Sequence, residues 1–273
     1  MLYGVVTMDQ ALAMGVSRRK VYRLVKQKIW EKLHSGVFLT TPNVEREAAW
    51  KAKLAGQLLS GGDRAMASHR SAALLHGLEG ILGLPEESTI PLKAPNRPVG
   101  SHRTRSVDPY PTTIGGLLTT SLVRTLIDLA DVCEVNQLEQ ALQSALRGTD
   151  PRRPDLWNQE LLRALRNLAL DYRQGSGSFR LQTVLDRRLD TDRPTGSFPE
   201  SVLFQELRAT GVPAISQPTL RIVDRHGATL DTLFPDIGIP NPLLLVEVDG
   251  VEAHTGEAAL GSPTLKGLAK PVP

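Results

Sequence analysis

Hydrophobic positions along this chain of 273 residues follow two different periods. Shorter alternating runs predict strands at residues 89–93 and 102–106 and a hairpin over residues 220–234. Apolar residues three or four positions apart predict amphipathic helices, at residues 8–14, 18–28, 44–59, 68–77, 119–130, 138–146, 156–172, 179–189 and 198–210. The mixture predicts an α+β protein.

One unbroken apolar run, residues 243–246, favours a buried strand that ends in acidic residues. Side chains alternate between the faces of a strand, so Glu247 and Asp249 point the same way. Asp231 lies on an earlier expected strand, and the intervening prolines are expected to form a turn between the two strands. Three carboxylates at neighbouring strand ends could hold Mg²⁺. The alternative is that these acids are solvated at strand ends.

Bulk composition is that of an ordinary globular protein, with 41% hydrophobic and 22% charged residues. No apolar run approaches the roughly 18–20 residues of a membrane span, and the N-terminus lacks the layout of a signal peptide. The single cysteine, Cys133, excludes an internal disulfide framework and a cysteine-based zinc cluster. We therefore expect a cytoplasmic protein with no membrane partner.

The net charge of +3 conceals a gradient along the chain. Residues 1–41 carry seven basic and two acidic side chains, a net charge of +5. Residues 197–273 carry five basic and nine acidic side chains, a net charge of −4. A basic head suggests a polyanionic partner, and an acidic tail suggests a carboxylate-rich site.

The basic head has the layout of a helix-turn-helix. Thr7 and Gln10 form a capping box, Gly15 ends the first helix, and Ser17 caps the second. Two short strands after the second helix would form a wing. In such motifs the start of the second helix enters the DNA major groove, which here presents Ser17, Arg18, Arg19, Lys20, Arg23 and Lys26. The alternative is a small helical docking module with a basic face.

This head resembles the winged helix-turn-helix of AbiEi-type antitoxin-like proteins. The matching features are the Gly15-Val16-Ser17 turn, Trp30, and the strand Gly36-Val37-Phe38, which has Phe where Tyr is usual. Three later segments are similar to the same family, at residues 68–73, 102–105 and 120–130. The resemblance implies a winged helix-turn-helix at residues 1–41 that binds double-stranded DNA, an antitoxin-like mixed α/β domain at residues 42–150, and a toxin or another protein as partner.

Between the antitoxin-like domain and the acidic tail, residues 151–196 are predicted to form a helical linker that begins in a Pro-containing basic segment. Two histidines of the preceding domain, His69 and His76, are seven positions apart and thus near one face of a helix. No carboxylate or cysteine nearby completes a metal set, so ordinary packing or capping is the favoured interpretation.

The tail resembles the restriction-endonuclease-like PD-(D/E)xK fold, and more narrowly the domains related to very-short-patch-repair endonucleases. The resemblance covers residues 197–254 and rests on Glu200, Asp231, Glu247, Asp249-Gly250 and His254. It implies Mg²⁺ bound by Asp231 and Glu247 with Asp249 assisting, Glu200 as an auxiliary acid, and His254 as a base or phosphate contact. Asp249 stands where the motif has Lys.

The domain is expected to be incomplete, because residues 255–273 show no helical or strand pattern where the related domains continue. A frameshift or early stop would explain this tail. Three functions follow as alternatives: a DNA-binding protein with a metal-dependent endonuclease domain, a non-catalytic DNA-binding regulator or antitoxin, and an inactive truncated relic.

Overall fold

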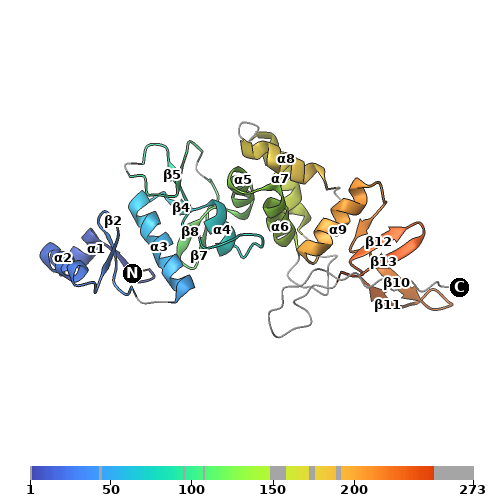
Figure 1. Cartoon of the computed structure of the whole chain (residues 1–273), viewed down its shortest axis with the longest axis horizontal. Coiled ribbons are helices and arrows are strands. Elements are labelled where there is room, and N and C mark those ends of the chain that lie inside the picture. The colour runs from blue at the N-terminus through green and yellow to red at the C-terminus, as the bar shows by residue number, and fades with distance from the viewer. Residues whose placement is uncertain are drawn as a thin grey trace. The chain divides into compact units, whose positions relative to one another are not determined.

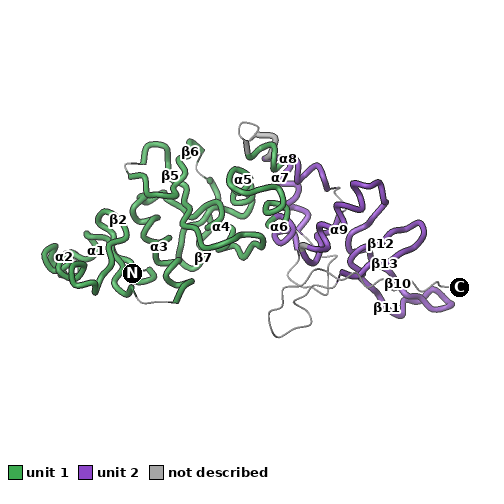
Figure 2. Tube along the Cα trace, viewed as in Figure 1, with its two compact units in different colours: residues 1–141, 172–181 green, residues 142–171, 182–273 purple. Residues whose placement is uncertain are grey.

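The computed structural model describes residues 2–42, 45–94, 96–106, 108–147, 158–171, 176–188 and 192–248. The chain divides into two compact units (Figure 2). Unit 1 comprises residues 1–141 and 172–181, and unit 2 comprises residues 142–171 and 182–273. Helices and several small sheets make up the described part of both units (Figure 1), which confirms the predicted α+β class.

Unit 1 begins with two short helices and three short strands. These elements, in chain order, are β1 (Val5–Thr7), α1 (Met8–Ala13), α2 (Arg18–Lys26), β2 (Glu31–His34) and β3 (Val37–Leu39). The strands form an antiparallel sheet in the order β1-β3-β2. The two helices and the wing strands were predicted, whereas β1 was not. A strand of three residues has too few positions to show an alternating pattern.

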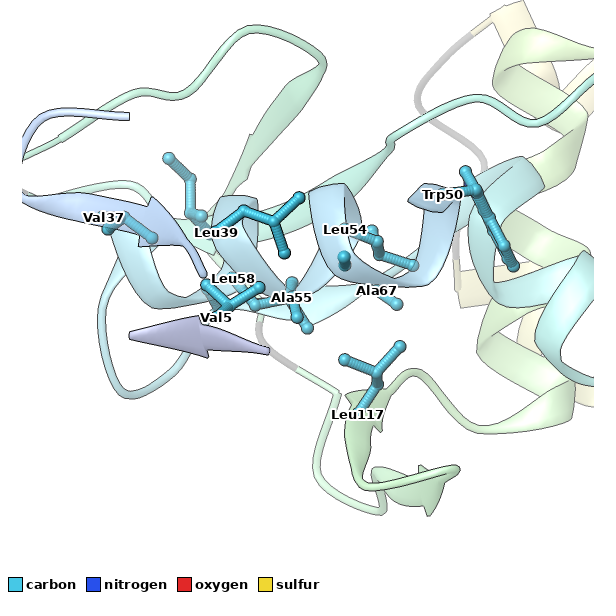
Figure 3. Close-up of a cluster of buried hydrophobic side chains, with 12 residues drawn as sticks. Val5, Val37, Leu39, Trp50, Leu54, Ala55, Leu58, Ala67 and Leu117 are labelled. Atoms are coloured by element: carbon cyan, nitrogen blue, oxygen red, sulfur yellow. The ribbon is translucent and has the colours of Figure 1, made fainter. Parts of the chain in front are cut away.

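Both faces of this small sheet are covered. On one face, Phe38 packs with Val6, Met8, Ala11 and Val21, which belong to β1, α1 and α2. On the other face, hydrophobic side chains of the next helix, α3 (Arg46–Gly61), complete a second cluster (Figure 3), which contains Val5, Val37, Leu39, Trp50, Leu54, Ala55, Leu58, Ala67 and Leu117. Side chains alternate across a strand, so consecutive residues of β3 serve two different cores.

Helix α3 lies between the small sheet and a second, five-stranded sheet of unit 1 (Figure 1). The sheet order is β6-β5-β4-β8-β7, with parallel pairing of β5 to β6 and of β4 to β8. Helix α3 approaches β2 closely at Gly56, where an added methyl group would lie only 2.6 Å from Cδ1 of Leu33. The strands are β4 (Met66–Ala67), β5 (Ser88–Pro91), β6 (Ser101–Thr104), β7 (Thr112–Ile114) and β8 (Leu117–Thr119).

Three further helices have residues in unit 1: α4 (His69–Leu75), which lies between β4 and β5 in the chain, and α5 (Leu122–Val132) and the first part of α6 (Val135–Leu146), which follow β8. The N-cap of α5 is Ser121, whose hydroxyl accepts a hydrogen bond from the Arg124 backbone amide at 3.3 Å. All three helices were predicted from their apolar spacing. Helix α8 (Ser176–Asp186) has residues in both units.

Unit 2 contains the helices α7 (Gln159–Asp171) and α9 (Phe198–Ala209) and five short strands. Strands β10 (Leu220–Val223) and β11 (Thr229–Leu233) form the predicted hairpin. A separate sheet has the order β13-β12-β9, from β9 (Ile215–Ser216), β12 (Ile237–Pro240) and β13 (Leu243–Val246). The buried leucines of α7 are Leu161, Leu162 and Leu165.

Two expectations for this unit were wrong. Residues 237–240 form strand β12 and not only a turn, because Pro240 ends the strand, where a missing N–H is tolerated. The apolar run of β13 is not buried: Leu243 is 70% exposed, and Leu244 and Leu245 are 43% and 40% exposed. An edge strand, paired only with β12 among the described residues, leaves its side chains open to solvent.

Asp249, His254 and the whole tail 255–273 lie outside the described residues. The domain boundaries expected at residues 41, 150, 196 and 254 remain predictions. Within the part of the chain that the structure describes, no helix is both long enough and apolar enough to cross a membrane.

Candidate functional site

The second helix of the head, α2, is fixed at its start by two local features. Gly15 adopts a φ of 80°, a left-handed conformation that favours glycine, and so reverses the chain after α1. The Ser17 hydroxyl then accepts a hydrogen bond from the Lys20 backbone amide at 3.3 Å. Thr7 and Gln10 cap α1 reciprocally, with distances of 3.1 and 2.9 Å. The predicted caps of both helices are thus confirmed.

Helix α2 presents its basic side chains to solvent. The face of α2 that carries Val21 packs on the core, and the Val21 side chain is fully buried. Five basic residues of the helix are all exposed: Arg18, Arg19, Lys20, Arg23 and Lys26. A shallow groove along the helix brings most of the predicted DNA-binding residues together, and its lining is Ser17, Arg19, Lys20, Tyr22, Arg23 and Lys26.

The groove lining omits Arg18 and includes one residue that the sequence reasoning passed over, Tyr22. Its side chain is 56% exposed, and its ring meets that of Phe38 edge to face, with centroids 6.4 Å apart. An exposed aromatic ring between cations was visible in the sequence as the centre of the run Lys20-Val21-Tyr22-Arg23. The groove can therefore offer cations to phosphates and a hydroxyl-bearing ring to a base edge or a sugar.

In unit 2, the structure does not bring the predicted metal ligands together within the described residues. Asp231 lies on β11 of the hairpin, is exposed, and accepts a hydrogen bond from the Thr232 backbone amide at 2.7 Å. Glu247 follows β13 of the other sheet, and β11 is not hydrogen-bonded to that sheet. No group of three His, Cys, Asp or Glu side chains that could hold a metal occurs in the described parts of the chain.

A different pair of acids does meet. The Gln217 side-chain nitrogen lies 3.1 Å from Oε2 of Glu200 and 3.3 Å from Oδ1 of Asp236. The second oxygen of Asp236 accepts a hydrogen bond from the backbone amide of Val248, the residue after Glu247, at 2.7 Å. We call Glu200, Gln217 and Asp236 the carboxylate cluster.

Asp236 was missed in the sequence, although the dipeptide Pro235-Asp236 ahead of Glu247 is the order of the PD-(D/E)xK motif itself. Burial raises the pKa of Glu200, and repulsion from Asp236 raises it further, against hydrogen bonds from Ser197, Gly196 and Gln217 that lower it. The bridging Gln217 has a φ of 47°, which is strained for a residue with a side chain.

The histidines of unit 1 do not pair as the seven-residue spacing suggested. His76 contacts the backbone oxygen of Thr120 through Nε2 at 2.8 Å. His69 instead stacks on His102 of β6, with ring centroids 3.7 Å apart and planes 19° apart. Burial lowers the pKa of His69 to about 2, helped by His102, Arg124 and Arg70. His69 is therefore neutral at pH 7.

Acid should destabilise the native protein through His69, because this side chain gains a proton only on unfolding. A lowered folded-state pKa contributes stability above the unfolded value of 6.5, and that stability is lost as the pH falls. Asn tolerates the φ of 51° at this position and has no proton to gain. We expect the free energy of unfolding of His69→Asn to rise relative to that of the wild type by about 1.4 kcal/mol for each pH unit below 6.5. Urea unfolding from pH 8 to 5 measures this difference.

The comparison between the two proteins removes the opposing effect of Asp128, whose pKa burial raises to about 6. Protonation of Asp128 stabilises the folded state as the pH falls towards 4, and it does so in both proteins alike. If the difference in free energy of unfolding between His69→Asn and the wild type stays constant across this pH range, His69 is not buried in its neutral form.

Comparison with protein families finds one match for this chain. The family described as a transcriptional regulator, AbiEi antitoxin, matches residues 1–41, which hold α1, α2 and the wing. This is the part of the chain that carries the basic groove. Among the curated proteins, none matches the chain.

Proposed function

We propose that this protein is a DNA-binding regulator of the AbiEi antitoxin type, which binds double-stranded DNA through α2. One observation carries the proposal: the exposed basic groove of α2 lies on a winged helix-turn-helix, within the segment that matches the AbiEi antitoxin regulators. The groove residues extend along the second helix from its N-cap, Ser17, to its last residue, Lys26, and the start of this helix is the part that enters the major groove in such motifs.

Affinity in this proposal comes mainly from phosphate neutralisation. Arg19, Lys20 and Arg23 would contact phosphates or base edges, while the buried Val21 keeps the opposite side of α2 anchored on the sheet. The absence of acidic residues from the first turn of α2 leaves its positive N-terminal dipole unopposed, which favours an approaching phosphate. A toxin or another protein as partner remains a proposal.

The test of this function is a salt titration with the full chain. Fluorescence anisotropy with a labelled 30-base-pair duplex should give an association constant whose logarithm falls linearly with the logarithm of the salt concentration. Binding that is absent at 50 mM salt would contradict the proposal. A selected duplex library would then show whether one sequence is preferred.

A second function is favoured by the carboxylate cluster: metal-dependent phosphodiester hydrolysis. Glu200 and Asp236 have the oxygen chemistry that Mg²⁺ prefers, and Mg²⁺ commonly takes only one or two carboxylates and keeps several waters. The Gln217 amide nitrogen, between two carboxylates, lies where a cation would also be attracted. When bound, the metal would supply charge stabilisation and an activated water.

The carboxylate cluster makes a sharp prediction about which aspartate matters. Asp236→Asn should lower the affinity for Mn²⁺, measured by electron paramagnetic resonance, by about tenfold or more, because one of the two carboxylates of the cluster is lost. Asp231→Asn, in the exposed hairpin, is the matched control and should bind Mn²⁺ as the wild type does.

Plasmid cleavage in Mg²⁺ or Mn²⁺ should follow the same order, with Asp236→Asn and Glu200→Gln inactive. If Asp231→Asn loses the metal and Asp236→Asn keeps it, the strand-end site expected from sequence is the correct one and the carboxylate cluster is not. Cleavage that survives all three substitutions would come from a contaminating nuclease and would remove the second function.

A further inference from the structure

A polar cavity of about 400 Å³ lies in unit 1, outside the DNA-binding groove and the carboxylate cluster. Residues of β5, β6, α4 and α5 and of the loop before β6 line it. Neither the helix-turn-helix nor the proposed nuclease chemistry uses any of them. Its size is within the range of small-molecule sites, roughly 300–1,000 Å³.

Two buried polar atoms of this cavity have no hydrogen-bond partner. They are the hydroxyl oxygen of Thr89, in a residue that is 3% exposed, and Oδ2 of Asp128, in a residue that is 4% exposed. The other oxygen of Asp128 accepts a hydrogen bond from Nε of Arg124 at 2.6 Å. A buried polar atom without a partner is costly, so such atoms mark places where a polar ligand would be stabilising.

The charge of the lining favours an anion. Three arginines, Arg97, Arg103 and Arg124, face two aspartates, Asp128 and Asp131. The lining histidines are neutral near pH 7, because burial lowers the pKa of both His69 and His102. Arg97 and Arg103 are exposed, and Arg103 donates to the Ala94 carbonyl at 3.1 Å. The exposed guanidinium groups are thus available at the open side, and the acceptor of Asp128 is buried.

The wall of the cavity is held in a strained conformation. His69 has a φ of 51°, although it is neither glycine nor asparagine and begins helix α4. Its ring stacks on His102, and its Nδ1 lies 2.8 Å from the Ser68 hydroxyl. Strain of this kind is found more often at binding sites than elsewhere, where the surrounding structure maintains it.

We propose that this cavity binds a phosphorylated sugar, either free or as part of a nucleotide. Arg97 and Arg103 bind the phosphate, since guanidinium groups match its geometry. Each of the two unpaired atoms has less than 1 Å² of accessible surface, so the lining side chains shift as the sugar enters: one hydroxyl then donates to Oδ2 of Asp128, and another exchanges a hydrogen bond with Thr89. A lining of mostly polar groups suits a ligand rich in hydroxyls.

Isothermal titration calorimetry on the full chain tests this with ribose 5-phosphate and AMP as probes. We expect at least one of them to bind about tenfold or more tightly than ribose or inorganic sulfate, because each of those provides only half of the contacts. Binding of ribose 5-phosphate alone identifies a free sugar phosphate, and binding of AMP alone identifies a nucleotide. Failure of both probes to bind at millimolar concentration would overturn the proposal.

The variants distinguish the cavity from other basic surfaces. Arg97→Gln with Arg103→Gln should weaken probe binding about tenfold or more. Arg105→Gln, an exposed arginine that does not line the cavity, is the matched control and should bind as the wild type does. Equal affinity in all these proteins would place the probe elsewhere and overturn the proposal.

Thr89→Val adds a readout that a purely structural role would not give. Removing an unpaired buried hydroxyl should raise the melting temperature of the ligand-free protein, while the affinity for the probe falls. A lowered melting temperature together with unchanged affinity would show that the hydroxyl serves the fold and not a ligand.

Discussion

Replacing Arg19, Lys20 and Arg23 together with alanine is expected to weaken binding of the full chain to duplex DNA by about two to three orders of magnitude in 0.1 M salt. Each phosphate contact that releases a counterion adds about 0.9 to the slope of affinity against salt concentration on logarithmic axes. Three lost contacts should therefore flatten that slope by about 2 to 3. Fluorescence anisotropy at four salt concentrations measures both quantities.

The matched control removes the same number of positive charges from another part of unit 1. Arg46, Lys53 and Arg64 are exposed residues of α3 and of the loop that follows it. Changed together to alanine, these three residues should alter the slope of affinity against salt concentration by less than the value of about 0.9 expected for one phosphate contact. If this control weakens binding as much as the α2 variant does, the protein's overall charge and not the α2 groove accounts for the interaction.

Phe38→Ala should have the largest effect on stability. This fully buried ring packs under α2, with the rings of Tyr22 and Trp30 each 6.4 Å away between centroids. Truncating a buried Phe to Ala costs about 3–5 kcal/mol, a large fraction of the stability of a typical domain. Urea unfolding followed by tryptophan fluorescence, to which Trp30 contributes, and by circular dichroism measures the loss.

DNA binding should fall with the same substitution, because α2 loses the side chain on which it is seated. Phe38→Leu, which keeps most of the volume, should retain much of the stability and of the DNA affinity. Tyr110→Ala removes an aromatic ring that is 81% exposed and should leave both unchanged. A Phe38→Ala protein with wild-type stability would contradict the two-sided packing of the head.

The head could be predicted from its sequence because its determinants are local. The Thr7–Gln10 capping box, the turn at Gly15 and the Ser17 cap each lie within a few residues of the helix that they define. Strand β1 was missed because its partner, β3, lies some thirty residues further along the chain. Only that pairing makes so short a segment a strand.

The meeting of the three residues of the carboxylate cluster could not be predicted from local sequence. Glu200, Gln217 and Asp236 come from a helix, the end of a short strand and the residue before another strand, and tertiary packing alone brings them together. Asp231 has the strand position that the pattern favoured, but strand β12 comes between β11 and β13 in the chain. Alternation along a strand predicts the face of a side chain and does not predict its partners.

The two-sided burial of β3 has a consequence for how the head opens. The segment that matches the AbiEi regulators ends at residue 41, but Val37 and Leu39 pack on α3 beyond that point. The last strand of the head and the next helix should therefore exchange their amide hydrogens for deuterium as one cooperative unit. Cutting the chain at residue 41 would expose one apolar face of β3 to water. The end of the segment that matches the family is therefore not the end of the folding unit.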